Sequence, residues 1–164
     1  QKMVYDGAIP SANSVSMLNL LKLFKFTGNS DYAQRADMML KLFGSHYANH
    51  GGQYTQALQA LQFSRLPSQE IVFSEGDSEE SEDVNNFVDQ LRTHYLPNAI
   101  QMKRPAGGYD MIYEFSDFIK AQKPLHNKTT VYICNNFACK EPVHSSSDFG
   151  RMLDLLKEKD GSKH

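Results

Sequence analysis

Apolar side chains in residues 1–67 recur with helical spacing and predict three successive helices. The first is expected to begin after Ser11, a good N-cap residue, and to end at Gly28. Between Val15 and Phe26 only four positions are polar. A helix that is apolar nearly all round is expected to be buried on most of its sides.

A second helix is expected over 30–48, where apolar residues occupy one face and charged residues the other. Gly51 and Gly52 then form a turn, and a third helix follows with Tyr54 and Leu61 on one face. Helical hairpins in this order of inner, outer and inner helices build an α/α barrel. We therefore expect the first 67 residues to be a unit of helical hairpins.

After Pro67 the apolar period changes to that of alternating strands and helices. Three short β-type runs are expected as strands, at 70–74, 99–102 and 129–134. Helical runs separate and follow them, at 84–95, 115–121 and 145–158. This alternation predicts a small α/β layer with a mainly parallel, three-stranded sheet over 68–164. The chain as a whole is thus expected to be α+β.

Composition and charge limit the classes of function. The 164 residues are 40% hydrophobic and 22% charged, which is ordinary for one globular domain or two small ones. A net charge of −2 gives no basic field, so nucleic acid is not an expected partner. No window approaches the ~18–20 consecutive apolar residues of a membrane span, so no membrane partner is expected either.

The start of the sequence carries no secretory signal. With two cysteines and no such signal, a reducing cytoplasmic setting is the expected location. Residues 1–7 resemble neither a natural N-terminus nor the boundary of a helix or strand, so we expect the chain to be a piece of a longer protein.

The acidic segment 75–83 lies where a doubly wound fold would bind a phosphate, between the first strand and its helix. Phosphate binding requires glycines, free backbone N–H groups and a positive helix end. This segment holds one glycine and a run of carboxylates, so it is interpreted as a solvated loop, and we expect no cofactor. His46 and His50 are interpreted as a solvated helix end rather than as metal ligands.

Both cysteines, Cys134 and Cys139, lie where the third strand ends. Four residues separate them, whereas a thioredoxin-type pair is separated by two and lies at a helix N-terminus. Structural zinc would need about four ligands, and here the set would be the two thiols, His144 and a distant His126. Three interpretations remain: structural thiols, which we favour, a reversible disulfide, and a metal site. The two cysteines are accordingly candidate redox residues, and no metal is expected.

The loop before the first helix collects four polar side chains, those of Asp6, Ser11, Asn13 and Ser14. Buried polar groups must be satisfied by hydrogen bonds, and Ser and Asn serve well as helix caps. One interpretation is therefore structural: these side chains cap the helix and shape the loop. The other is that they face a central cavity and bind the hydroxyl groups of a small polar ligand.

Two segments resemble a known family. Asp6-Gly-Ala-Ile-Pro-Ser-Ala-Asn-Ser-Val15, followed by the Leu-rich helix, is similar to the barrel segment DGA-x-PS-x-NS of the YyaL-like proteins, also known as the spermatogenesis-associated, thioredoxin-domain family. Val131-Tyr-Ile-Cys-Asn-Asn-Phe-Ala-Cys-Lys-Glu-Pro-Val143 resembles the same family's YVC-x-NF-x-C-x-x-P. Between them, Glu70-Ile-Val-Phe and Tyr95-Leu-Pro-Asn98 fall where that family has a strand and an LPN turn. The motifs occur in the family's order over nearly the whole chain.

The resemblance implies that the chain is the C-terminal portion of a protein with an N-terminal thioredoxin-like domain and an (α/α)6 barrel. That barrel is similar to those of N-acylglucosamine 2-epimerases, and residues 1–67 would be its last hairpins. Asp6, Ser11, Asn13 and Ser14 would then lie at the mouth, where such barrels bind sugars. The histidine acid/base pair of a sugar epimerase cannot be placed in this sequence, so the catalytic residues stay unassigned.

Two functions follow from the resemblance. The first is a sugar-isomerase- or epimerase-like enzyme of carbohydrate metabolism, inactive as this fragment because a barrel site needs several hairpins. The alternative is a non-catalytic protein, either a redox scaffold or one whose barrel binds a ligand or partner without turnover. In either case the apolar surface of an incomplete barrel predicts self-association.

Overall fold

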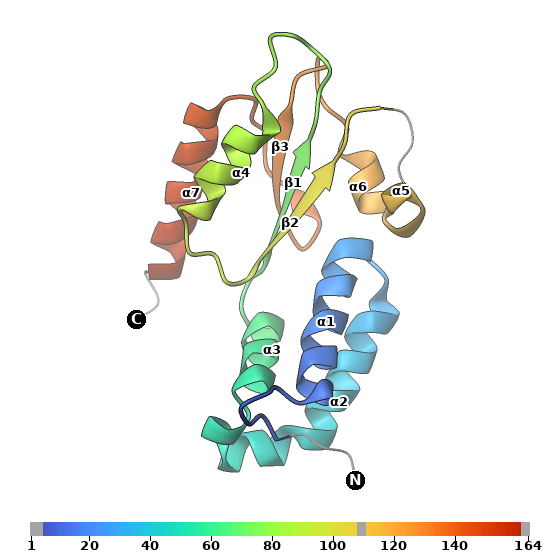
Figure 1. Cartoon of the computed structure of the whole chain (residues 1–164), viewed down its shortest axis with the longest axis vertical. Helices are drawn as coiled ribbons and strands as arrows, with labels where there is room; N and C mark the ends of the chain where they lie inside the picture. The colour runs from blue at the N-terminus through green and yellow to red at the C-terminus, as the bar shows by residue number, and fades with distance from the viewer. Residues whose placement is uncertain (1–4, 108–110, 162–164) are drawn as a thin grey trace. The chain divides into compact units, whose positions relative to one another are not determined.

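The computed structural model describes residues 5–107 and 111–161, with side chains of the last helix described as far as residue 156. Two compact units make up the chain, residues 1–68 and 69–164 (Figure 1). The first is helical, and the second combines a β-sheet with helices. Among the described residues, no helix is both long enough and apolar enough to span a bilayer.

Three α-helices and one short 3-10 helix form the described part of the first unit: α1 (Ala12–Thr27), α2 (Ser30–Asn49), η1 (Gly51–Gln53) and α3 (Thr55–Arg65). Helix α1 begins where the sequence predicts, because the Ser11 hydroxyl accepts a hydrogen bond from the Ser14 backbone N–H (3.2 Å). It ends at Gly28, whose φ of 76° suits glycine and whose N–H bonds to the Phe24 carbonyl. Both predicted ends of this helix are confirmed.

The expectation that α1 is buried on most sides is wrong within this chain. Its buried positions form one stripe at helical spacing: Ser14, Met17, Leu21 and Lys25. By contrast, Val15 and Leu23 are 37% and 41% exposed. Within the described first unit α1 packs against α2 and α3, and two neighbours leave part of a helix uncovered.

The second unit alternates strands and helices, in the order β1 (Gln69–Ser74), α4 (Val84–Arg92), β2 (Ala99–Arg104), α5 (Ile112–Phe115), α6 (Asp117–Ala121), β3 (Thr130–Asn135), β4 (Ala138–Cys139) and α7 (Ser146–Gly161). The strands form a four-stranded sheet in the order β2-β1-β3-β4. Strands β1 and β2 are parallel, with Ser74 opposite Arg104. Strand β3 runs antiparallel to β1 and places Cys134 opposite Glu70.

The core of the second unit lies between the sheet and helices α4 and α7, which cover the same face (Figure 1). Alternation along β1 and β3 sends four apolar side chains to this face: Ile71, Phe73, Val131 and Ile133. The Phe149 ring of α7 meets the rings of Phe73 and Phe87 edge to face, with centroids 5.9 and 5.8 Å apart. Strands β1 and β3 and helices α4 and α7 therefore form a single hydrophobic core.

The sheet is mixed and four-stranded, which corrects the prediction of a mainly parallel, three-stranded sheet. Strand β3 begins at Thr130, opposite Ser74 at the carboxyl end of β1. The chain therefore re-enters the sheet at the end of the strands where β1 and β2 finish. For β3 to run parallel to β1, the connection from β2 would have to return along the full length of the strands before β3 could begin. Helices α5 and α6 have four and five residues; each rises about 6–8 Å, whereas a strand of this length spans about 20 Å.

Candidate functional site

The Asp6 carboxylate is the centre of the candidate site in the first unit, and it is 7% exposed. Its Oδ1 accepts a hydrogen bond from the Ser11 backbone N–H (2.8 Å), and its Oδ2 accepts from the N–H groups of Gln56 and Ala57 (3.0 and 3.1 Å). The latter two lie in the first turn of α3, and the residue before that helix, Tyr54, provides no side-chain cap. Asp6 therefore caps α3 from a distant part of the chain.

Two buried hydroxyl groups connect this carboxylate to α1. The Oγ atoms of Ser11 and Ser14 are 2.8 Å apart, and both residues are buried. Asn13 is half-buried on the same helical turn. The structure thus brings Asp6, Ser11 and Ser14 into one hydrogen-bonded cluster, with Asn13 at the adjacent helix position. Their role in binding a sugar-like ligand stays a prediction.

The pKa of Asp6 lies below its ordinary value. Burial raises the pKa of this carboxyl, but hydrogen bonds from the backbone of Ser11 and Ala57 and from the Ser14 and Ser11 hydroxyls outweigh burial. The group is therefore ionised at neutral pH and cannot serve as a general acid there. Its oxygens instead fix the start of α1 to the start of α3.

Tyr47 of α2 lies near this cluster, but the sequence pattern indicates it only as one of the apolar residues on one face of that helix. Tyr47 is 4% exposed, and its ring centroid lies 5.3 Å from that of Tyr54. Burial, and then the negative charge of Asp6, raise the pKa of Tyr47. Among the described residues, its hydroxyl oxygen has no hydrogen-bond partner. Buried tyrosine hydroxyls usually have one, so an inward-facing tyrosine was the signal available in the sequence.

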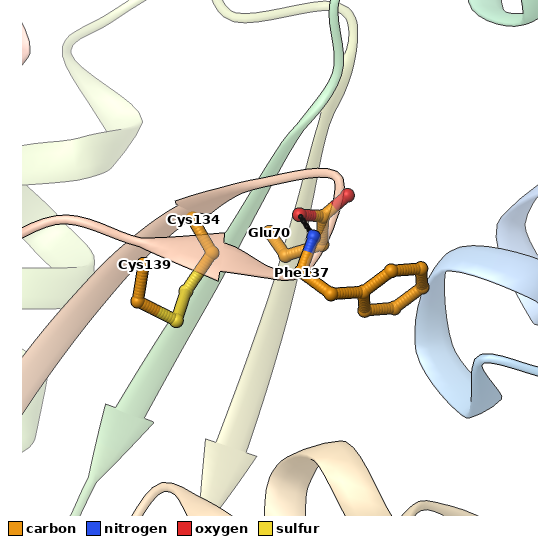
Figure 2. The surroundings of a disulfide bond; sticks show 4 residues. All are labelled: Glu70, Cys134, Phe137 and Cys139. Atoms are coloured by element: carbon orange, nitrogen blue, oxygen red, sulfur yellow. Dashed lines mark hydrogen bonds between the residues drawn. A yellow bond between two sulfur atoms is a disulfide. The ribbon is translucent and has the colours of Figure 1, made fainter.

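The two cysteines form a disulfide between β3 and β4 (Figure 2). This corrects the favoured interpretation of structural thiols, and it leaves no thiolate for a zinc set with His144. The pairing follows from a tight hairpin, since Asn136 and Phe137 both have positive φ (49° and 66°) and the strands fold back directly. Cys134 is buried, whereas Cys139 is exposed.

The buried carboxylate of Glu70 holds the turn of this hairpin. Glu70 lies in β1 directly opposite Cys134, and its Oε2 accepts a hydrogen bond from the Phe137 backbone N–H (3.1 Å) (Figure 2). The Phe137 ring meets Phe118 edge to face, with centroids 5.2 Å apart. A bulky residue seldom adopts a positive φ, and such backbone conformations persist where the surroundings hold them. These two contacts hold Phe137 in its turn conformation.

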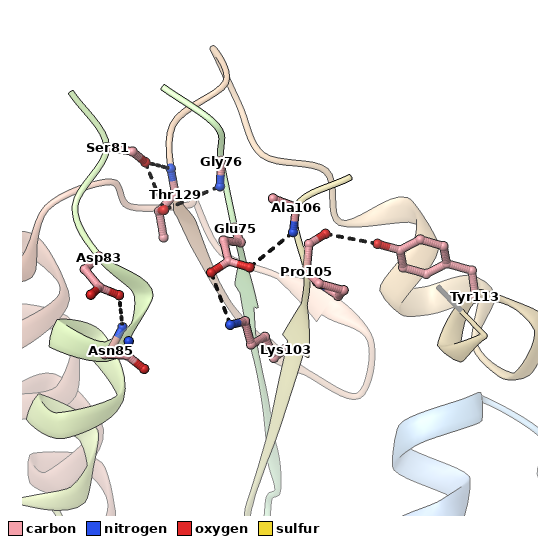
Figure 3. Close-up of polar contacts among 10 residues, drawn as sticks. All are labelled: Glu75, Gly76, Ser81, Asp83, Asn85, Lys103, Pro105, Ala106, Tyr113 and Thr129. Atoms are coloured by element: carbon pink, nitrogen blue, oxygen red, sulfur yellow. Dashed lines mark hydrogen bonds and ion pairs between the residues drawn. The ribbon is translucent and has the colours of Figure 1, made fainter. Parts of the chain in front are cut away.

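The acidic segment 75–83 is only partly a solvated loop. Glu82 accepts a hydrogen bond from the Ser146 backbone N–H (3.1 Å), which connects the segment to the start of α7. Asp83 caps α4 by accepting from the Asn85 N–H (2.9 Å) (Figure 3). Its carboxylates therefore position helices as well as facing water.

The two histidines that the sequence interpretation assigns to a solvated helix end, His46 and His50, lie at the end of α2. His46 is in the last turn, and its ring meets the Tyr54 ring edge to face with centroids 6.5 Å apart. His50 is the residue that caps this helix. In the described ranges, no three His, Cys, Asp or Glu side chains are grouped to hold a metal ion.

Spermatogenesis-associated protein 20 of human (Homo sapiens) is 28% identical to this chain over 148 residues, and the mouse (Mus musculus) protein is 26% identical over the same length. Both alignments cover 90% of the chain. The chain is homologous to spermatogenesis-associated protein 20. It spans about one-fifth of these relatives, 19% of the human and 18% of the mouse protein. No protein-family model and no solved structure matches the chain. Homology to spermatogenesis-associated protein 20 supports the family that the ordered motifs indicate.

Proposed function

We propose that this chain is the C-terminal part of a larger protein with a thioredoxin-like domain and a sugar-isomerase- or epimerase-like (α/α)6 barrel. Helices α1 to α3 are the end of that barrel, and the cluster around Asp6 contributes to a site for a small polyhydroxylated ligand. The homology to a relative about five times longer supports the larger protein. The helical hairpins of the first unit agree with the end of a barrel.

The observation that carries this proposal is the buried hydroxyl of Tyr47, which has no hydrogen-bond partner among the described residues and lies near an ionised carboxylate. A buried phenol O–H needs an acceptor, and a sugar hydroxyl provides one while donating to another oxygen. The Ser11 and Ser14 hydroxyls in the same cluster can both donate and accept. The site thus offers donors and acceptors together, as a sugar requires.

The same geometry favours binding over proton transfer for this cluster. The Asp6 oxygens already accept three backbone hydrogen bonds, and its pKa is low. Acid and base groups must then come from other hairpins of the barrel, so the 164-residue chain alone is inactive. The exposed apolar side chains of its helices, among them Leu23, Met38 and Leu42, favour self-association of the chain.

A screen for isomerisation of sugars and sugar phosphates, run on the longer protein, tests the proposal. Tyr47→Phe removes one oxygen and keeps the ring, so it should weaken sugar binding with little loss of stability. Tyr95→Phe is the matched control, because Tyr95 is 85% exposed and lies in the other unit. If the longer protein shows no turnover of any sugar and no sugar-induced rise in melting temperature, the enzyme function is contradicted. Equal behaviour of the two variants would remove Tyr47 from the site.

A second candidate function, a redox scaffold, is favoured by the disulfide itself. Cys139 is exposed in strand β4 of the hairpin, so we expect an external thiolate to reach this side of the disulfide. If the location is cytoplasmic, as the sequence predicts, a disulfide there is more often redox-active than structural. Alkylation and mass spectrometry over a range of thiol and disulfide ratios measure the reduction potential. A pair that stays oxidised under cytosolic ratios is structural and contradicts this function.

A further inference from the structure

The segments that follow β1 and β2 lead to opposite faces of the sheet. The segment after β1 leads to α4, which lies with α7 on the face of Phe73. The segment after β2 leads to α5 and α6 on the other side (Figure 1), where the Tyr132 hydroxyl donates to the Lys123 carbonyl. Adjacent parallel strands whose connections diverge in this way leave a crevice outside their carboxyl ends, where open α/β sheets bind ligands.

A pocket occupies this crevice and has a volume of about 390 Å³. Its lining comes from the last residue of β2 and from the segments after β1, β2 and α6, chiefly Glu75, Asp77, Arg104, Ala106, Lys123 and Pro124. Small-molecule sites commonly have volumes of about 300–1,000 Å³. The pocket is therefore large enough for a small metabolite, and all its lining belongs to the second unit.

The acidic side of the pocket has one engaged and one available carboxylate. Glu75 Oε1 pairs with Lys103 Nζ at 3.1 Å, and Glu75 Oε2 accepts from the Ala106 N–H at 3.2 Å (Figure 3). Glu75 thus holds the segment after β2 against β1. Asp77 is exposed, and its carboxylate is in no ion pair with the residues that the structure describes.

The basic side of the pocket is formed by Arg104 and Lys123. The Arg104 guanidinium lies over the Tyr113 ring, with Cζ 5.2 Å from the centroid, and the Tyr113 hydroxyl donates to the Pro105 carbonyl (Figure 3). Arg104 Nε is buried without a hydrogen-bond partner in the described ranges. A guanidinium held by a ring presents its donors in a fixed fork that matches a carboxylate. Lys123 is exposed and adds a second positive charge.

We propose that this pocket binds a small zwitterion, a molecule that carries a carboxylate and an ammonium group, as amino acids and short peptides do. The ligand carboxylate lies against Arg104 and Lys123, and its ammonium group lies against Asp77. A purely anionic ligand would meet the negative charge of Asp77, and a purely cationic ligand would meet the two cations. A molecule with both charges matches the pocket on both sides.

Nuclear magnetic resonance of the isotope-labelled chain, titrated with glycylglycine, tests this proposal. Saturable shifts are expected at the amides of residues 75–77, 104, 106 and 107, with a dissociation constant on the order of 1 mM. Acetate and methylammonium, each carrying one of the two charges, should bind at least about tenfold more weakly, a difference of about 1.4 kcal/mol. An absence of saturable shifts, or equal binding of acetate, would overturn the proposal.

Variants separate the site from the general charge of the surface. Lys123→Gln should weaken binding of glycylglycine, whereas Lys140→Gln, at an exposed lysine outside the pocket, should leave it unchanged. Asp77→Asn should abolish the preference for glycylglycine over acetate. Amide spectra of the unligated variants show whether each is folded. Equal affinities of the two lysine variants for glycylglycine would count against the site. So would an Asp77→Asn variant that still prefers glycylglycine to acetate.

Discussion

The carboxylate of Asp6 accepts a hydrogen bond from the backbone N–H of Ala57, which lies 51 residues further along the chain (3.1 Å). The same side chain also accepts from the N–H groups of Gln56 and Ser11. One buried carboxylate therefore joins the N-terminal loop to the starts of two helices. Its removal would leave several buried N–H groups without an acceptor.

Replacement of Asp6 by Ala should lower the free energy of unfolding of the helical unit by about 2–4 kcal/mol. Asp37→Ala is the control, because Asp37 forms an exposed ion pair with Lys41 (2.6 Å) and such pairs contribute less than about 1 kcal/mol. Denaturant unfolding followed by circular dichroism at neutral pH measures both changes. Similar small losses in the two variants would show that the cap is not important for stability.

The lowered pKa of Asp6 predicts acid sensitivity of the same unit. An aspartate whose folded-state pKa lies below its unfolded value of about 3.9 contributes its full stabilisation above that value. That stabilisation is lost as the pH falls through the folded-state pKa. The unmodified chain should therefore lose more stability between about pH 5 and pH 2 than Asp6→Asn does. Melting temperatures across this range give the comparison, and parallel curves would contradict it.

Reduction of the disulfide between Cys134 and Cys139 should destabilise the second unit by about 2 kcal/mol, the value expected for a cross-link that closes a short loop. The double variant Cys134→Ala/Cys139→Ala should show no further response to reductant. Unfolding midpoints with and without reductant measure the difference. Identical midpoints for the unmodified chain would mean that the Glu70–Phe137 hydrogen bond and the Phe118 contact hold the hairpin without the disulfide.

Gly76→Ala should destabilise the second unit by about 1–3 kcal/mol. A Cβ at this position would lie 2.4 Å from the Asn127 carbonyl oxygen and 2.5 Å from the Lys128 carbonyl carbon, so backbone must move. At Gly44 within α2 a Cβ meets nothing within 4 Å, and Gly44→Ala should stabilise the first unit by up to about 1 kcal/mol. Urea unfolding should show that the free energy of unfolding falls in Gly76→Ala and rises in Gly44→Ala. An unchanged free energy of unfolding in Gly76→Ala would contradict the close approach of residue 76 to the backbone of Asn127 and Lys128.

Local signals in the sequence predicted the ends of α1, because a cap at Ser11 and a left-handed residue at Gly28 depend on a few neighbouring residues. They did not predict the direction of β3. That direction depends on where the chain re-enters the sheet. The connection through two short helices brings the chain back at the end of the strands where β2 finishes, so β3 runs antiparallel to β1.

The polar cluster shows the same limit at the level of a site. The sequence indicated Asp6, Ser11 and Ser14 as a group because they are neighbours in one loop. The sequence does not indicate that the Asp6 carboxylate caps α3 or that Tyr47 lies near it, since both depend on how the fold brings together residues some forty to fifty positions apart. The disulfide is an intermediate case. The spacing of the two cysteines in the sequence is compatible with a disulfide, and the tight turn formed by Asn136 and Phe137, both with positive φ, brings the cysteines together.

The position of Phe149 has a consequence for synthesis of the chain. Its ring packs on Phe73 of β1, yet it enters the ribosomal exit tunnel 76 residues later, as the numbering gives (149 − 73). Until α7 has emerged, the apolar face of β1 lacks the cover that this helix provides, and exposed strands of this kind are prone to pair with other chains. The second unit therefore completes its fold only after α7 has left the ribosome, and a nascent chain that pauses before that point is the form most in need of a chaperone.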